Sequence, residues 1–284
     1  MSFIIEEPTC ISFSGGRTSA LMLHKVLEAN GGLPECAKVV FANTGKEMPE
    51  TLDFIEDCSQ QWSVPINWVE LEITQDDDGK FFYGTKVVNY DSASRLGEPF
   101  SALIRARKYT PNPVARFCTQ DLKVNRQIEF MQKHFDYWTA FIGIRADESR
   151  RAAKIHNKQI KHQDQYCPLY VSGITKSDVQ RFWSTHPFDL RLPAVNGATI
   201  WGNCDLCFLK GHNAKLSIIR ERPDLAEWWI EEEAKMSKRT KQKYGGLSYF
   251  AKDQPSYSDM KLIASSQGSL FDYDDKSIPC FCGD

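Results

Sequence analysis

The hydrophobic pattern near the N-terminus predicts a strand, a loop and a helix in succession. Apolar side chains occupy much of the short run at residues 10–13, which ends at the tripeptide Ser14-Gly15-Gly16. Leucine and valine then recur over residues 21–27 at a spacing that suits one face of a helix. The Ser-Gly-Gly turn is therefore expected at the N-terminus of a helix.

Three later segments have the pattern of buried or half-buried strands. Residues 37–44 and 137–143 are almost continuously apolar, as in strands covered on both faces, and residues 66–73 alternate between apolar and polar. A helix that starts at Pro49 is expected between two of these strands. This order of elements predicts a doubly wound, mostly parallel, Rossmann-like α/β sheet.

The same pattern divides the chain into a large domain and a smaller C-terminal region. Residues 1–190 carry the strand and helix signals, and residues 191–284 are expected to be mainly helical and contain several cysteines. Residues 74–115 break the rhythm with an acidic turn, a group of aromatic side chains and a basic run. We expect an irregular insertion that lies over the site and contacts substrate; a solvated surface excursion is the alternative.

Composition excludes some classes of partner. The 284 residues include 35 basic and 37 acidic ones, so no overall field attracts nucleic acid or a membrane. No apolar run approaches the roughly 18 residues that cross a bilayer, and the acidic N-terminus lacks the basic start of a signal peptide. We therefore expect a cytoplasmic protein without a membrane partner. Basic stretches at residues 105–116 and 235–243 either contact nucleic-acid phosphates or form solvated faces.

The Ser-Gly-Gly loop has the chemistry of an anion-binding site. Gly15 and Gly16 allow backbone conformations that other residues avoid, so their amides can point at a ligand. The hydroxyls of Ser14, Thr18 and Ser19 add further donors at the helix N-terminus. A phosphate group fits this arrangement. The alternative is a turn between strand and helix that binds nothing.

Polar residues also follow two other predicted strands, at the edge where doubly wound sheets bind ligands. Residues 43–47 should face the same crevice as the Ser-Gly-Gly loop. Beyond Gly143, Arg145 suits a phosphate, and Asp147 or Glu148 suits Mg²⁺. A helix with an acidic first turn would explain these carboxylates without any ligand.

The cysteines point to metal or redox chemistry. Nine cysteines without a secretion signal do not suggest a disulfide framework. Cys204 and Cys207 have the spacing of a zinc half-site or a redox pair, although coincidence is also open. The cysteines at positions 10, 36 and 58 lie in or beside apolar segments and are expected to be inert buried thiols.

Five motifs together resemble the phosphoadenosine phosphosulfate reductase family, within the PP-loop ATP pyrophosphatase superfamily of adenine nucleotide alpha hydrolase-like folds. They follow one another in order over about two thirds of the chain. The motifs are Ser14-Gly-Gly-x-x-Ser19, Asn43-Thr-Gly-x-x-x-Pro-Glu-Thr51, Arg116-Phe-Cys-Thr-x-x-Leu-Lys123, Gly143-Ile-Arg-x-x-Glu-Ser149, and the segment 168–179.

The resemblance implies an enzyme of nucleotide and sulfur chemistry. The reductases have an altered Ser-Gly-Gly loop, whereas here it is intact, as in relatives that cleave ATP between the α and β phosphates. Those relatives include transfer-RNA thiolation enzymes and ATPase components of DNA phosphorothioation systems. We therefore expect an ATP pyrophosphatase that adenylates an acceptor for sulfur transfer. A phosphoadenosine phosphosulfate or adenosine phosphosulfate reductase, and a non-catalytic nucleotide-gated subunit associated with nucleic acid, are the alternatives.

The resemblance also implies site residues and partners. ATP and Mg²⁺ are the expected ligands, a cysteine desulfurase is a candidate sulfur donor, DNA or RNA is a candidate acceptor, and a dimer is a candidate assembly. The expected catalytic residues are Ser14, Lys123, Arg145 and Cys282. The expected nucleotide-binding residues are Ser12, Ser14, Gly15, Gly16, Arg17, Thr18, Ser19, Asn43, Thr44, Gly45, Glu47, Gly143 and Arg145.

A metal centre is the last implication of the resemblance. Cys118 lies where cluster-containing family members place ligands, and with Cys204, Cys207 and one of Cys280 or Cys282 it would hold a 4Fe-4S cluster. Structural zinc uses the same ligand set and is the alternative. Cys282 with the following glycine also resembles the C-terminal nucleophile of the reductases, so Cys280 could be the ligand and Cys282 a sulfur carrier.

Overall fold

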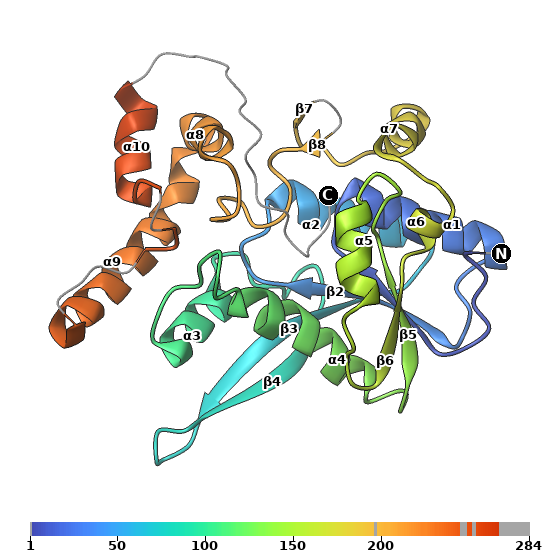
Figure 1. The fold of residues 1–284 in the computed structure, drawn as a ribbon, viewed down its shortest axis with the longest axis horizontal. Coiled ribbons are helices and arrows are strands. Elements are labelled where there is room, and N and C mark those ends of the chain that lie inside the picture. Colours follow the sequence, from blue (N-terminus) through green and yellow to red (C-terminus); the bar gives the residue numbers. More distant parts are fainter. Residues whose placement is uncertain (1, 196–197, 245–248, 252–253, 267–284) are drawn as a thin grey trace.

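A central six-stranded sheet organises the chain in a computed structural model that describes residues 2–195, 198–244, 249–251 and 254–266 (Figure 1). The strand order is β4-β3-β2-β1-β5-β6, and every neighbouring pair is parallel except β3 and β4. The predicted doubly wound, mostly parallel sheet is therefore confirmed. The strands are β1 (Thr9–Phe13), β2 (Ala37–Asn43), β3 (Ile66–Gln75), β4 (Phe81–Val88), β5 (Trp138–Ile142) and β6 (Gln163–Tyr166).

Helices fill the connections between these strands. They are α1 (Arg17–Asn30), α2 (Pro49–Gln61), α3 (Glu98–Arg107), the π-helix η1 (Thr119–Val124), α4 (Asn125–Met131), α5 (Ser149–His156), α6 (Pro168–Val171) and α7 (Lys176–Thr185). Pro49 occupies the first turn of α2, as predicted. Thr175 caps α7 through a reciprocal pair of hydrogen bonds with Asp178.

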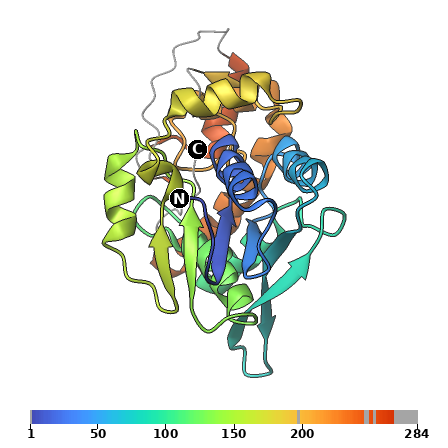
Figure 2. The ribbon, with the colours of Figure 1, turned by 90° about the vertical axis from the view of Figure 1, so that its right-hand side faces the viewer.

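Alternate side chains of the central strands enter different cores. Ile11 and Phe13 point to the face that is covered by α1 and α2. Cys10 and Val40 point to the opposite face, where α4 contributes Phe130. Figure 2 shows the blue helices α1 and α2 on one side of the sheet and the green helix α4 on the other. Both faces of β1 and β2 are thus covered, which is why these strands are almost continuously apolar in sequence.

The chain order creates a switch point beside β1. The chain goes from β1 to β2 on one side and later returns to β5 on the other side. The loops after β1, β2 and β5 therefore leave the same edge of the sheet at its centre, where ligands bind in open α/β sheets.

The segment 74–115 differs from the expectation of an irregular insertion. Strand β3 continues to Gln75, turns at residues 76–79 and pairs with β4 in an antiparallel hairpin, and α3 follows. Gly79 adopts φ +79°, and Asp76 closes the turn through hydrogen bonds with Lys80. Exposed Phe82 and Tyr83 obscured the strand pattern, because β4 is an edge strand with little core to face.

A helical layer follows the sheet domain. It contains the two-stranded β7 (Ala194–Val195) and β8 (Ala198–Thr199), then α8 (His212–Glu221), the 3₁₀ turn η2 (Pro223–Leu225), α9 (Ala226–Tyr244) and α10 (Tyr257–Ser266). In Figure 1, α9 lies next to α3, and α8 and α10 lie farther from it. Trp229 of α9 is completely buried. Across residues 2–195, 198–244, 249–251 and 254–266, no helix combines the length and the hydrophobicity that a membrane span requires.

Candidate functional site

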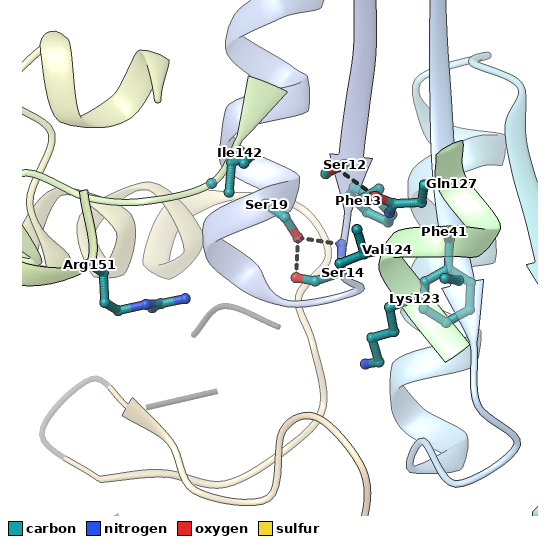
Figure 3. Close-up of a pocket in the computed structure, with 12 residues that line it drawn as sticks. Ser12, Phe13, Ser14, Ser19, Phe41, Lys123, Val124, Gln127, Ile142 and Arg151 are labelled. Atoms are coloured by element: carbon teal, nitrogen blue, oxygen red, sulfur yellow. Dashed lines mark hydrogen bonds between the residues drawn. The ribbon is translucent and has the colours of Figure 1, made fainter. Parts of the chain in front are cut away.

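The loop between β1 and α1 is closed by the side chain of Ser19. The Ser14 amide donates to Ser19 Oγ at 3.2 Å, and the two hydroxyl oxygens lie 2.9 Å apart (Figure 3). Ser19 Oγ also donates to the Gly16 carbonyl at 3.0 Å. These bonds hold the chain in a tight arc at the N-terminus of α1. Such an arc, with the positive end of a helix dipole behind it, favours an anion.

Two glycines are required by the packing around this loop. Gly15 adopts φ +78°, and a Cβ there would lie 2.8 Å from side-chain atoms of Thr51 and Ile55 in α2. Gly143, just after β5, approaches the backbone of Ser19 so closely that a Cβ would lie 3.2 Å from its Cα. The loop is thus held between α2 and the end of β5.

A cavity opens beside the loop, with cationic side chains on two sides. Lys123 of η1 and Arg151 of α5 extend into the space in front of Ser14 and Ser19 (Figure 3). The volume of this cavity is about 50 Å³. The lining residues are Ser12, Phe13, Ser14, Ser19, Phe41, Ala42, Lys123, Val124, Gln127, Ile142, Gly143 and Arg151.

Arg145 connects the loop after β5 to the N-terminus of α1. Its side chain is nearly buried, and Nη1 donates to Thr18 Oγ1 at 3.1 Å. Its Nε contacts Asp147 Oδ1 at 3.1 Å, and Glu148 lies 3.6 Å from Nη2. Glu148 also pairs with Arg151. The two carboxylates proposed for Mg²⁺ are therefore engaged with arginines, and they fix the positions of those arginines.

Arg17 lies in the motif but its side chain leaves the loop. Its Nε and Nη2 each lie 2.7 Å from a carboxylate oxygen of Asp189, and Nη1 donates to Thr199 at 2.9 Å. Trp183 in turn donates to the Arg17 carbonyl at 2.9 Å. The side chain thus anchors the segment that follows α7, whereas only the backbone of Arg17 belongs to the loop.

The loop after β2 is held by buried hydrogen bonds. Asn43 donates to Glu70 at 2.6 Å and accepts from the Gly45 amide at 3.1 Å. Glu47 accepts from the amide and the hydroxyl of Thr44, and its other oxygen lies 3.5 Å from Nζ of Lys123. Glu47 therefore positions the cation that enters the cavity. On the neighbouring strand β1, the Ser12 hydroxyl donates to the Gln127 side chain at 2.9 Å.

The Cys204–Cys207 turn packs directly on this loop. Glu47 and Cys204 form an isolated antiparallel bridge, and Thr44 Oγ1 lies 3.5 Å from the Cys204 sulfur. Asp205 forms an ion pair with Lys46 at 2.8 Å and accepts a hydrogen bond from Trp229 at 2.7 Å. The predicted nucleotide loop and the predicted metal turn are therefore neighbours.

A buried lysine stands beside the second cysteine of the turn. Lys215 of α8 is 1% exposed and hydrogen-bonds to Gln254. Burial lowers the pKa of its ammonium group to about 8, although nearby Cys207 and Glu233 act in the opposite direction. Burial also raises the pKa of Tyr257, whose hydroxyl donates to the Leu206 carbonyl at 2.6 Å. Sequence reasoning missed this environment, because the contributing residues are distant in the chain.

The metal set is only partly assembled in the part of the chain that the structure describes. The Cys207 amide donates to the Cys204 carbonyl, so both thiols belong to one tight turn. Cys118 is half-buried at the start of η1. Within that same part of the chain, no group of three or more His, Cys, Asp or Glu side chains could hold a metal ion. Cys280 and Cys282 lie outside the described residues.

Of the three cysteines expected to be inert buried thiols, two are buried and the third, Cys36, is only half-buried. Cys10 and Cys58 are almost completely buried. Burial raises the pKa of the Cys10 thiol to about 12 and also raises the pKa of the Cys58 thiol. Cys167 is also buried, and burial raises the pKa of its thiol to about 11. These thiols are poor nucleophiles at neutral pH.

Comparisons with known proteins identify the sheet domain. The family model described as "Phosphoadenosine phosphosulfate reductase domain" matches residues 8–190. An uncharacterized nin region protein of Escherichia phage lambda is 30% identical over 208 residues, which cover 70% of this chain and 65% of the phage protein. An uncharacterized protein of Methanocaldococcus jannaschii is 32% identical over 171 residues, 58% of this chain and 29% of that protein. The chain thus spans less than two thirds of either relative.

A solved structure also aligns with the chain. It is the U34-tRNA thiolase NcsA from Methanococcus maripaludis with its 4Fe-4S cluster, which is 12% identical in sequence. The alignment has a TM-score of 0.38 and covers 93% of this chain and 72% of the thiolase.

Proposed function

The chain belongs to the phosphoadenosine phosphosulfate reductase domain family, and from this premise we propose that it is an ATP pyrophosphatase that adenylates an acceptor for sulfur transfer. The loop of residues 14–19 would hold the β and γ phosphates, and the cavity of about 50 Å³ beside it would receive the adjoining α-phosphate. The proposal gives a role to the intact Ser-Gly-Gly sequence. It also explains why cationic side chains converge in front of the loop.

One observation carries the proposal: Ser19 closes the loop between β1 and α1 at the switch point of the sheet, with its Oγ 3.2 Å from the Ser14 amide and 2.9 Å from the Ser14 hydroxyl. Backbone amides at such a site bind phosphate oxygens without any need for a side-chain charge. Gly15 lets the loop pack against α2 where a larger residue would displace it.

The proposed reaction has two displacement steps. An acceptor oxygen attacks the α-phosphorus, the bond from this phosphorus to the bridging oxygen breaks, and pyrophosphate leaves. A sulfur nucleophile then bonds to the activated acceptor atom and displaces AMP. Lys123 and Arg151 would stabilise negative charge as it develops on the phosphates, and Arg145 would orient the first turn of α1 through Thr18. Mg²⁺, when bound with the nucleotide, would neutralise the leaving pyrophosphate.

A metal centre is proposed separately from these steps. Cys204 and Cys207 would supply two thiolates, Cys118 a third, and Cys280 or Cys282 the fourth, for a 4Fe-4S cluster or, alternatively, zinc. Only the first two belong to one turn in the described residues, so the set does not yet fit a four-ligand centre. For this reason no reaction step is assigned to the metal.

A reductase is the second candidate, and the family match itself favours it. In that reaction a thiolate, for which Cys282 is the candidate, would attack the sulfur of phosphoadenosine phosphosulfate or adenosine phosphosulfate. The nucleotide phosphate would leave, and a second thiol would release sulfite and form a disulfide. Cys282 lies outside the described residues.

Two substrates separate these candidates. Protein purified without oxygen is incubated with labelled ATP or labelled phosphoadenosine phosphosulfate, and pyrophosphate and sulfite are measured. Double-stranded DNA, transfer RNA and a cysteine desulfurase are added in turn as candidate acceptors and sulfur donor. Pyrophosphate release that is lost in Ser19→Ala and kept in Ser265→Ala, which changes an exposed residue of α10, supports the proposal. Sulfite release without ATP cleavage would replace it with the reductase.

A further inference from the structure

A second, larger cavity lies on the other side of the first turn of α1. It has a volume of about 270 Å³ and is enclosed by α1, α7 and the segment from Asp189 to β8. Helix α7 packs on α1, and in Figure 1 it lies above that helix with β7 and β8 alongside. The lining residues are Arg17, Thr18, Arg145, Lys176, Val179, Gln180, Trp183, Ser184, Asp189, Ala194 and Thr199.

This cavity is distinct from the one in front of Ser14. The two share no lining residue. They meet at the same loop, because Ser14 and Ser19 line the first cavity whereas Arg17 and Thr18 line the second. A ligand in the second cavity would therefore lie within one helical turn of a nucleotide in the first, without occupying its place.

The charge of the lining favours an anion. Three cations, Arg17, Arg145 and Lys176, face a single carboxylate, Asp189. Arg17 is neutralised by Asp189 through two contacts of 2.7 Å. Arg145 is neutralised from behind by Asp147 and Glu148, which do not line the cavity.

Lys176 is the one cation of these three that has no carboxylate partner among the described residues. Its side chain is half-buried at the first position of α7, and it forms no ion pair or hydrogen bond with any residue in the described part of the chain. The neighbouring carboxylate Asp178 is occupied by the Thr175 cap and by Arg181. The hydroxyls of Thr18, Ser184 and Thr199 and the amide of Gln180 add neutral hydrogen-bonding groups around the same space.

We propose that this cavity binds a tetrahedral oxyanion, a phosphate or sulfate group carried by the second substrate, with Lys176 as its principal partner. An ammonium group with three donors and no carboxylate partner binds such an anion without first breaking an ion pair. The identification of the ligand as the second substrate rests on the proposed function. The binding of the anion itself does not.

Calorimetry tests the inference without any turnover. Inorganic phosphate and, separately, inorganic sulfate are titrated into the full chain, alone and in the presence of a saturating non-hydrolysable ATP analogue. We expect the analogue to displace the anion from the loop of residues 14–19 and to leave one further anion site, and the anion that binds more tightly to this remaining site identifies the group. Lys176→Gln should weaken binding by about tenfold or more, since a charge-assisted hydrogen bond is lost. Lys176→Arg should retain most of the affinity.

Lys133→Gln is the matched control, because Lys133 is an exposed lysine that follows α4. A thermal melt of each variant verifies folding. The inference is overturned if no anion site remains when the ATP analogue is bound, or if Lys176→Gln binds the anion at that remaining site like the wild type. Failure of ATP cleavage with anion binding intact would instead count against the proposed function alone, so the two failures are distinguishable.

Discussion

Lys46 and Asp205 form an ion pair in which Nζ lies 2.8 Å from Oδ2, and both side chains are almost completely excluded from solvent. The pair joins the loop after β2 to the Cys204–Cys207 turn. The Asp205 amide also donates to the Lys46 carbonyl at 2.7 Å. Two segments more than 150 residues apart are thus connected through both backbone and side chains.

Removal of one partner of this pair should destabilise the protein strongly. Burial already raises the pKa of Asp205, and Lys46 is the group that opposes this shift most. Lys46→Met leaves a buried carboxylate without its counterion, which costs about 3–5 kcal/mol of unfolding free energy. Lys25→Met, which breaks the largely exposed pair with Glu28, should cost less than about 1 kcal/mol. Urea unfolding measures both, and equal costs would contradict the prediction.

Gly15→Ala should damage the loop beyond the cost of its backbone angle. A left-handed angle costs a non-glycine residue about 1–2 kcal/mol, and here the new Cβ would also crowd Thr51 and Ile55. Gly31→Ala is the control, since it has φ +66° but open space around it. We expect nucleotide affinity to fall only in Gly15→Ala, and the free energy of unfolding to fall more in Gly15→Ala than in Gly31→Ala. Similar behaviour of the two variants would argue against tight packing of the loop.

Lys123→Met should weaken the nucleotide site. The side chain enters the cavity in front of Ser14 and is positioned by Glu47 at 3.5 Å. Loss of one cation that stabilises developing charge typically lowers the rate by about 10²-fold. Pyrophosphate release and nucleotide affinity are measured, with Lys133→Met as the control. Unchanged kinetics in Lys123→Met would remove it from the catalytic residues.

The metal content of protein kept from oxygen should depend on the cysteine turn. We expect a brown protein with about four irons per chain, and loss of both colour and iron in Cys204→Ser and Cys207→Ser. Cys36→Ser, at a half-buried position remote from the turn in sequence, should keep its iron. One equivalent of zinc in the wild type would overturn the cluster, and full iron content in Cys204→Ser would overturn the ligand assignment.

The stability of the fold should fall at mildly acidic pH because of a histidine pair. His24 of α1 and His186 after α7 have ring centroids 5.6 Å apart and pack against Trp62 and Phe182. Burial lowers the pKa of both imidazoles, whereas Glu28 raises that of His24 and Asp189 raises that of His186; Lys25 adds to the lowering at His24.

Proton linkage determines whether the free energy of unfolding rises or falls with pH. The unfolded chain takes up protons as the pH falls through 6.5, while the folded chain holds both imidazoles neutral to lower pH. Unfolding free energy should therefore decrease as the pH falls below 6.5. Replacing both histidines with phenylalanine should flatten this dependence in denaturant titrations. An unchanged slope in the double variant would show that other groups are responsible.

Periodicity was sufficient to predict the sheet but not its edges. The central strands and α1 follow from their apolar spacing, because they are covered by a core, and Pro49 marks the start of α2. Strand β4 was missed because it is an edge strand, with exposed Phe82 and polar neighbours that give no clear alternation. Local patterns report burial, and an edge strand has little burial to report.

The site was predictable where a motif is local and was missed where it depends on distant contacts. The loop of residues 14–19 closes on itself through Ser19, so its conformation could be predicted from its own sequence. The direction of the Arg17 side chain depends on Asp189, and the environment of Cys207 depends on Lys215. Arg151, two residues beyond a recognised motif, could have been found from its position there. No spacing rule reveals the contact between Arg17 and Asp189 or the position of Lys215 beside Cys207.

The bond from Arg17 to Asp189 has a practical consequence for how the protein is handled. Asp189 is the penultimate residue of the stretch matched by the family model, and Thr199, a second partner of Arg17, lies just beyond it. An expression clone trimmed to the matched stretch would cut the polypeptide one residue after this anchor and would also discard Asp205, the counterion of Lys46. Biochemistry on such a fragment would report on a loosened loop of residues 14–19, so assays should use all 284 residues.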